Sequence, residues 1–115
     1  MIRQGEIYLV DFGKKYHSEL GKKRPAIVIQ NNMLNRAVAE RLYPSVMVVP
    51  LTTDNVETDY KLKLSARDKL KKESYAIMTW ICSVDVSRFD LQTGALTQLK
   101  AEEFAALKAR LCAVT

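Results

Sequence analysis

An arginine and a threonine, each at one end of an apolar run, are the residues best suited to chemistry. Arg24 precedes Pro25 at the start of one run, and Thr52 ends another. Cutting a phosphodiester in RNA requires a proton to leave the ribose 2′-hydroxyl, neutralisation of the charge that grows on the phosphate, and protonation of the leaving oxygen. The planar guanidinium of an arginine suits the second task, because it binds two phosphate oxygens together. In purely structural roles, Arg24 would instead pair with Glu19 or Asp11, and Thr52 would form a turn.

The segment between the first two predicted strands adds polar candidates. Ser18 offers a hydroxyl and Glu19 a carboxylate, in a loop that is rich in lysine. A single carboxylate in a basic loop is usually only a charge partner, so these residues alone do not define a site.

Metal and nucleotide cofactors are not expected. Cys82 and Cys112 do not form a C-x-x-C pair, and His17 is the one histidine, so the residues make no convincing ligand set. The four glycines form no phosphate-binding loop. Both cysteines are therefore predicted to act as small buried apolar side chains.

Positive charge is concentrated in the first part of the chain. Of the net +5, residues 1–72 carry 14 Lys and Arg against 8 Asp and Glu, or +6, and residues 73–115 carry 4 against 5, or −1. This clustering suits a polyanionic partner, although lysines on loops and edge strands also discourage aggregation. The clusters are Lys14, Lys15, Lys22, Lys23 and Arg24, then Lys61, Lys63, Arg67, Lys69, Lys71 and Lys72.

Hydrophobic patterns predict five or six short strands and two or three helices. Strands are expected at 7–12, 25–30, 45–53, 60–65, about 75–83 and 94–97, with a turn at 85–88. In the strand 60–65, Lys61 and Lys63 are predicted to form a basic face. Pro50 requires a sheet edge or a bulge, because proline gives no ladder donor.

Two amphipathic helices are predicted. Leu34, Val38 and Leu42 would share one face of a short helix that Pro44 ends, and a helix over 100–113 would turn Phe104, Leu107 and Leu111 inward. The 115 residues are expected to form a single domain, 1–115, with an α+β fold built on a twisted sheet or small barrel. Neither a membrane span nor a signal peptide is apparent, so a cytoplasmic location is expected.

The ordered set of motifs resembles the MazF/PemK (Kid) family of toxins from type II toxin–antitoxin pairs. The resemblance covers essentially the whole chain. Its most specific residues are Gly5-Glu6-Ile7, Ser18-Glu19, Arg24-Pro25, Asn32, Asn35 and Pro50-Leu51-Thr52.

The resemblance implies a fold, an activity and partners. The fold is a small SH3-like β-barrel of five to seven twisted strands with a carboxyl-terminal amphipathic helix, as in MazF, PemK and CcdB. The activity is metal-independent, sequence-specific cleavage of single-stranded RNA, which arrests translation. The protein would form a homodimer whose groove takes RNA or the acidic, disordered tail of the cognate antitoxin.

Site residues follow from the same resemblance. Arg24 and Thr52 match the catalytic pair, and Glu19 matches the family's acidic residue. The remaining candidates are RNA contacts: Ser18, Lys22, Lys23, Asn32, Thr53, Lys61, Lys63 and Trp80.

The chain departs from the family at one position of the site. Several members carry an acid followed by glutamine where this chain has Thr79-Trp80. The proton acceptor is therefore left open between Glu19, Thr52 and a water molecule, since arginine is a poor base. Trp80 would either stack on a base or belong to the core or a dimer interface.

Two other functional classes remain open. Toxins such as CcdB bind gyrase without catalysis, and a plain RNA-binding barrel would bind a strand without cutting it. Gyrase poisoning by such toxins is usually attributed to residues at the carboxyl terminus, particularly an aromatic one. This chain ends "RLCAVT", which favours the enzyme.

Overall fold

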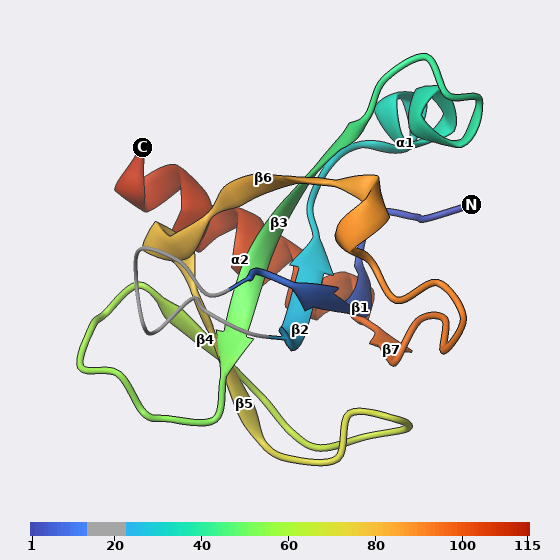
Figure 1. Cartoon of the computed structure of the whole chain (residues 1–115). Helices are drawn as coiled ribbons and strands as arrows, with labels where there is room; N and C mark the ends of the chain where they lie inside the picture. The colour runs from blue at the N-terminus through green and yellow to red at the C-terminus, as the bar shows by residue number, and fades with distance from the viewer. Residues whose placement is uncertain (14–22) are drawn as a thin grey trace.

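A curled antiparallel sheet with one long helix across it forms the protein, which we describe from a computed structural model for residues 1–13 and 23–115 (Figure 1). The strand order is β4-β5-β3-β2-β1-β7, and β6 also pairs with β3. The predicted α+β fold with a carboxyl-terminal helix is confirmed. The predicted small barrel is an open half-barrel. The elements are β1 (Glu6–Asp11), β2 (Lys23–Val28), α1 (Asn32–Ala39), β3 (Ser45–Thr52), β4 (Lys61–Leu64), β5 (Ser74–Ile77), η2 (Met78–Trp80), β6 (Cys82–Asp85), η3 (Val86–Arg88), β7 (Thr97–Gln98) and α2 (Ala101–Val114).

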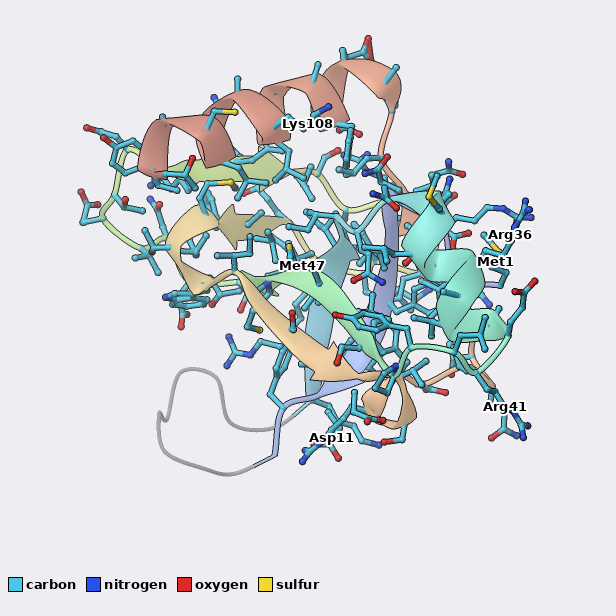
Figure 2. The ribbon with its side chains drawn as sticks, turned by 90° about the horizontal axis from the view of Figure 1, so that it is seen from above. Met1, Asp11, Arg36, Arg41, Met47 and Lys108 are labelled. Atoms are coloured by element: carbon cyan, nitrogen blue, oxygen red, sulfur yellow. The ribbon has the colours of Figure 1, made fainter. Side chains whose placement is uncertain are left out.

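The sheet is buried on both faces over much of its area. One face, which we call the Leu51 face, is covered by α2, and Leu107 of that helix is fully buried against it. The other, the Arg24 face, buries Val28 and Val48 under Phe89. Figure 2 shows α2 lying along one side of the sheet while β6 crosses the other side. Within the described chain, no helix is long and apolar enough to cross a membrane.

Strand β3 changes its partner at Pro50. Up to Val48 it pairs with β6, and from Leu51 it pairs with β5. Because Ile29 N donates to Met47 O, odd-numbered residues of β3 point their backbone groups at β2 and even-numbered ones point them the other way. The nitrogen of Pro50 therefore faces the side where the ladder is interrupted, and no donor is missed there.

The single strand predicted over about 75–83 is wrong, because it is two strands separated by η2. On β3, Val48 pairs with Cys82 and Leu51 pairs with Ala76. The two β3 residues are three positions apart, whereas their partners are six positions apart. The three extra residues are accommodated by the 3₁₀ turn of η2, opposite the interruption at Pro50. This turn carries Trp80 out of the sheet.

The first helix is shorter than predicted, and only part of the predicted apolar face is buried. It ends at Ala39, followed by Arg41 with a φ of +62°, rather than at Pro44. Leu42 lies beyond the helix and is 75% exposed, and Leu34 is also exposed. The buried residues of α1 are Asn35 and Val38, so Val38 packs inward as predicted, whereas the second buried residue is a polar asparagine and not a leucine.

The two cysteines differ in burial. Cys82 is half-buried on β6, where burial raises the pKa of its thiol. Cys112 is exposed, which contradicts the prediction. Helix α2 packs its face through Phe104, Leu107 and Leu111, as predicted, and Cys112 lies beside that stripe.

The Gly5-Glu6-Ile7 motif fixes the start of β1. Gly5 has a φ of +91°, a conformation that glycine adopts readily. Its N donates to Val28 O and its O accepts from Leu99 N, so it joins the start of β1 to the end of β2 and to the residue after β7. The Glu6 carboxylate accepts from Arg3 N at 2.7 Å and from the Tyr8 hydroxyl at 3.0 Å. Burial and this hydrogen bond raise the pKa of Tyr8 to about 12.

A buried amide pair joins α1 to the sheet. Gln30 Nε2 donates to Asn35 Oδ1 and to Ser45 O, and Gln30 Oε1 accepts from Met47 N. Asn35 Nδ2 donates to Gln30 O at 2.9 Å. Since buried amides without partners are costly, this pair fixes the position of α1.

We predict that Asn35→Ala lowers the free energy of unfolding by about 1–3 kcal/mol, because it leaves buried groups of Gln30 without partners. Urea denaturation followed by circular dichroism measures the loss. The control is Asn55→Ala, at an exposed loop asparagine. Equal stability of the two variants would contradict the prediction.

Candidate functional site

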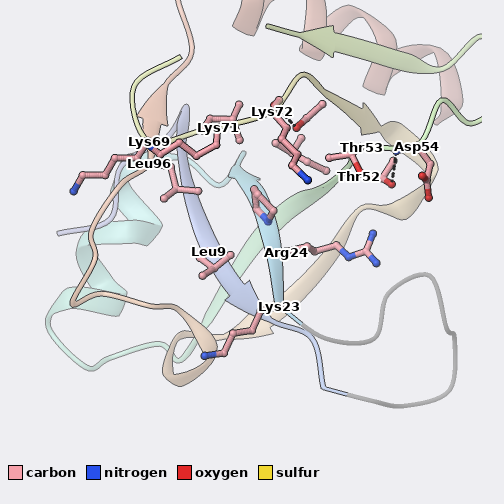
Figure 3. A pocket seen from close by; sticks show the side chains of 14 residues that line it. Leu9, Lys23, Arg24, Thr52, Thr53, Asp54, Lys69, Lys71, Lys72 and Leu96 are labelled. Carbon is pink, nitrogen blue, oxygen red and sulfur yellow. Dashed lines mark hydrogen bonds between the residues drawn. The ribbon is translucent and has the colours of Figure 1, made fainter. Parts of the chain in front are cut away.

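A cleft of about 520 Å³ opens where β2 begins and β3 and β5 meet the loops (Figure 3). Its floor is mostly aliphatic and its rim carries four lysines against one carboxylate. The lining residues are Leu9, Lys23, Arg24, Pro25, Leu51, Thr52, Thr53, Asp54, Lys69, Leu70, Lys71, Lys72, Ser74 and Leu96.

Arg24 and Thr52 meet at the edge of this cleft. Strands β2 and β3 are antiparallel with Ala26 opposite Pro50, so continuing the register by two residues places Arg24 across from Thr52. Such directly opposed side chains lie on the same face of a sheet. The structure thus brings together two residues that are far apart in the sequence.

Trp80 lies against the guanidinium of Arg24. The Arg24 Cζ is 5.8 Å from the centroid of the half-buried indole ring, within cation–π range. The contact orients the arginine and excludes water from one side of it. It exists because η2 carries Trp80 out of the ladder.

The hydroxyl of Thr52 is oriented by the following turn. Its Oγ1 accepts a hydrogen bond from Asp54 N at 3.1 Å. An oxygen that already accepts a hydrogen bond still has its proton to donate. This geometry suits Thr52 as a donor to an anion.

The Arg24 face continues across two more strands. Thr52 is paired with Tyr75 of β5, and Tyr75 with Lys63 of β4, so these side chains follow one another across the sheet. Lys61 Nζ lies 5.4 Å from the centroid of the Tyr75 ring and donates to Asn55 Oδ1 and Val56 O. This face therefore carries two aromatic rings, Trp80 and Tyr75, and three cations, Arg24, Lys61 and Lys63, on the strands next to Thr52 and beyond.

On the Leu51 face, the cleft is bordered by three lysines of the β4–β5 connection, Lys69, Lys71 and Lys72, which we call the lysine arm. Figure 3 shows them along one border of the cleft, with Arg24 pointing away from Leu9 and Leu96. The arm and the Arg24 face meet at the strand end that carries Thr52.

A partly buried ion pair ties the connection to α2. Arg67 donates from Nη1 and Nη2 to the two carboxylate oxygens of Glu103, both at 2.7 Å, and their side chains are 18% and 20% exposed. Hydrogen bonding to Arg67 lowers the pKa of Glu103, and the same contact raises the pKa of Arg67. The bidentate geometry holds the arm against the body of the protein.

Comparison with known proteins gives a full-length match. The family described as "PemK-like, MazF-like toxin of type II toxin-antitoxin system" matches residues 3–115. The chain belongs to this toxin family.

Relatives and solved structures agree with the assignment. An endoribonuclease MazF of Staphylococcus saprophyticus is 29% identical over 90% of this toxin and 84% of its own length. One of Staphylococcus epidermidis is 31% identical over 67% of this toxin, a stretch that spans 57% of that relative. An endoribonuclease of a mycobacterial species, solved with its cognate antitoxin, shares the fold with a TM-score of 0.74 at 18% identity, over 98% of this toxin and 93% of that chain.

Four predicted site residues of this toxin line the cleft, three lie near it on the Arg24 face, and Asn32 lies elsewhere. Arg24, Thr52, Lys23 and Thr53 line it. Lys61, Lys63 and Trp80 lie on or beside the Arg24 face. Asn32 lies at the opposite end of β2, where its Oδ1 accepts from Gln4 N and Asn35 Nδ2. Ser18, Glu19 and Lys22 lie outside the described residues.

Sequence reasoning did not single out Tyr75 or the lysine arm as site residues. The arm appeared only as positive charge, and Tyr75 only as the start of a strand. Pairing of β4 with β5 would have placed Tyr75 beside Lys63, but no short-range pattern fixes that register. Among the described residues, no group of three His, Cys, Asp or Glu side chains could hold a metal ion.

We predict that the Arg67–Glu103 pair makes folding stability depend on acid pH. Since the folded state lowers the pKa of Glu103, the stabilisation is present above the unfolded value of about 4.5 and is lost as pH falls through the folded value. Urea denaturation between pH 7 and pH 3 should therefore show a smaller loss of stability on acidification for Glu103→Gln than for the wild type. Glu102→Gln, at an exposed residue of the same helical turn, should keep the wild-type slope. Identical slopes for both variants would rule out the assignment.

Proposed function

We propose that this toxin is a sequence-specific endoribonuclease that cuts single-stranded RNA without a metal ion and so arrests translation. The observation that carries the proposal is the juxtaposition of Arg24 and Thr52 at the edge of a lysine-rimmed cleft. The names of the curated relatives, endoribonuclease MazF, support the same activity.

The reaction needs no cofactor beyond the chain. The ribose 2′-hydroxyl loses its proton, the 2′-oxygen forms a bond to phosphorus, and the bond from phosphorus to the 5′-oxygen breaks as that oxygen takes up a proton. The products are a 2′,3′-cyclic phosphate and a 5′-hydroxyl. Negative charge on the non-bridging oxygens is greatest in the transition state, so donors aimed at them accelerate the step.

Arg24 and Thr52 are the proposed catalytic residues. Arg24 neutralises the phosphate oxygens and, placed at the strand end, can also protonate the leaving oxygen. Thr52 donates to the same phosphate, in keeping with the hydrogen bond that its oxygen accepts from Asp54 N. The candidates for the base are still Glu19, Thr52 and a water molecule. The geometry of Thr52 suits a hydrogen-bond donor better than a base.

Nucleobases next to the scissile phosphate would stack on the aromatic rings of the Arg24 face. Trp80 lies beside Arg24, and Tyr75 lies beside Thr52. Each ring presents a surface that any base can cover. Lys61 and Lys63 then contact the neighbouring phosphates.

The toxin is proposed to act as a homodimer in the cytoplasm and to be neutralised by an antitoxin with an acidic, disordered tail. Solved structures of the same fold hold a cognate antitoxin, which supports such a partner. The basic rim of the cleft complements an acidic segment. Light scattering at defined protein concentrations tests the dimer.

Arg24→Ala is predicted to reduce the rate of RNA cleavage by about 10²–10³-fold, the cost of removing one preorganised donor. The assay incubates purified protein with long RNA in EDTA, maps the 5′ ends and identifies the terminal phosphates. Arg36→Ala, at an exposed arginine of α1, is the control and should cut at the wild-type rate. Intact RNA with the wild-type protein, or normal cutting by Arg24→Ala, would overturn the mechanism.

RNA binding is predicted to quench the emission of Trp80, which is the single tryptophan of the chain. The ligand is a 2′-O-methyl oligonucleotide that contains the mapped cleavage motif and cannot be cut. Because stacking on an aromatic ring is worth about 1–3 kcal/mol per base, Trp80→Leu should weaken binding by about tenfold, while Trp80→Phe should retain most of it. An unquenched emission at saturating oligonucleotide would place Trp80 in the core or an interface instead.

A further inference from the structure

The backbone of the lysine arm is held by hydrogen bonds and by a buried side chain, unlike that of a freely solvated loop. Arg67 and Leu70 exchange two backbone hydrogen bonds, which close a tight turn, and Lys69 N donates to Leu96 O. Leu70 is 3% exposed and belongs to the core beside Leu51. Together with the Arg67–Glu103 pair, these contacts hold the backbone of the arm in one place.

Asp68 adds a further attachment. Its carboxylate accepts a hydrogen bond from Thr97 Oγ1 of β7 at 2.7 Å, although its own φ is +49°. This is a conformation that costs free energy in a residue other than glycine. The strained residue persists because its neighbours fix it, and it turns the chain so that Lys69 and Lys71 border the cleft.

The arm brings positive charges together without neutralising them locally. Lys69 Nζ donates to a backbone carbonyl, Thr93 O. Within the described chain, the ammonium groups of Lys71 and Lys72 have no ion-pair partner, and the nearby acid Glu73 pairs with Lys63. Like charges held on a rigid turn repel one another, and an anionic ligand in the cleft would offset the repulsion.

The cleft connects the arm to the catalytic residues. Arg24 and Thr52 line the same cavity as Lys69, Lys71 and Lys72, so a strand with its scissile phosphate at Arg24 has neighbouring phosphates within reach of the arm. The floor is formed by Leu9, Leu51 and Leu96, which can pack against ribose and base surfaces but cannot hydrogen-bond to base edges. Such a surface adds affinity without reading sequence.

We propose that the lysine arm, with Lys23, is an extended binding site for the backbone phosphates of single-stranded RNA on one side of the scissile bond. The proposal rests on the endoribonuclease activity proposed above. Nucleotides on the Arg24 face set the cleavage motif, and those over the Leu51 face are held by charge and by packing that does not read sequence. Efficient cleavage therefore depends on the length of the strand as well as on its sequence.

The test uses the mapped motif in a minimal oligonucleotide and in versions extended by about eight nucleotides of neutral sequence at the 5′ end, the 3′ end or both. Wild-type toxin should cut the substrate extended on one particular side with a kcat/KM at least tenfold higher, mainly through KM. The triple variant Lys69→Gln, Lys71→Gln, Lys72→Gln should lose this advantage, so that its kcat/KM for the extended substrate falls to its own value for the minimal substrate. The control Arg36→Gln, Lys100→Gln, Lys108→Gln changes net charge equally, at exposed positions away from the cleft, and should keep the advantage. Figure 2 shows Arg36 and Lys108 on the two helices.

Salt dependence gives a second measurement. Each phosphate neutralised on a single strand contributes about 0.7 to the slope of log affinity against log salt, so the triple variant should reduce the slope for the extended, uncleavable oligonucleotide by about 2. Circular dichroism and urea denaturation establish that the variant is folded. An unchanged slope in a folded variant would overturn the proposal.

The outcomes separate this inference from the activity on which it depends. If the wild type cuts none of these substrates, the proposed endoribonuclease function fails. If it cuts all lengths equally well, or if the lysine-arm variant keeps the length advantage, the function stands and the extended site is overturned. A variant that cuts normally but escapes inhibition by an acidic peptide would assign the arm to a peptide ligand and would also overturn the proposal.

Discussion

The missing backbone donor of Pro50 is the constraint on which the rest of the structure depends. A central strand normally pairs along its whole length, but β3 has no hydrogen to offer at Pro50 on the side away from β2. The partner strand therefore breaks into β5 and β6, and the three surplus residues form η2. Because η2 leaves the ladder there, Trp80 reaches Arg24. A substitution that restored a donor at position 50 would remove the reason for the break on which the site is built.

The two faces of the sheet differ in chemistry at the end of β3. On the Arg24 face, rings and cations lie close to Thr52, so the arrangement suits a phosphate between stacked bases. On the Leu51 face, an aliphatic floor and a rigid lysine arm suit a charged chain of any sequence. Both faces meet at Thr52 because side chains alternate along a strand. Recognition and affinity can thus be supplied by neighbouring residues that never contact one another.

The motifs that carry the family resemblance have several kinds of role. Gly5 and Glu6 fix the start of β1, and Asn32 and Asn35 hold α1 against the sheet, so their positions reflect folding requirements. Arg24 and Thr52 line the cleft and belong to neither of the two buried apolar clusters. A motif therefore identifies the family as a whole, and only the position of each residue shows whether it can touch a ligand.

The sequence by itself determined the fold class, most strand and helix positions and the closing helix, because these depend on local hydrophobic periodicity, and its ordered motifs named Arg24 and Thr52 as candidates. It could not determine the break between β5 and β6, the burial of Asn35 in α1 or the environment of Cys112, since these follow from strand register and from which elements cover which face. Tyr75 and the lysine arm are brought to the candidate site only through the pairing of β4, β5 and β3 and the ion pair between Arg67 and Glu103. Tertiary structure decided these features because they join residues whose separation in the sequence leaves no local signal.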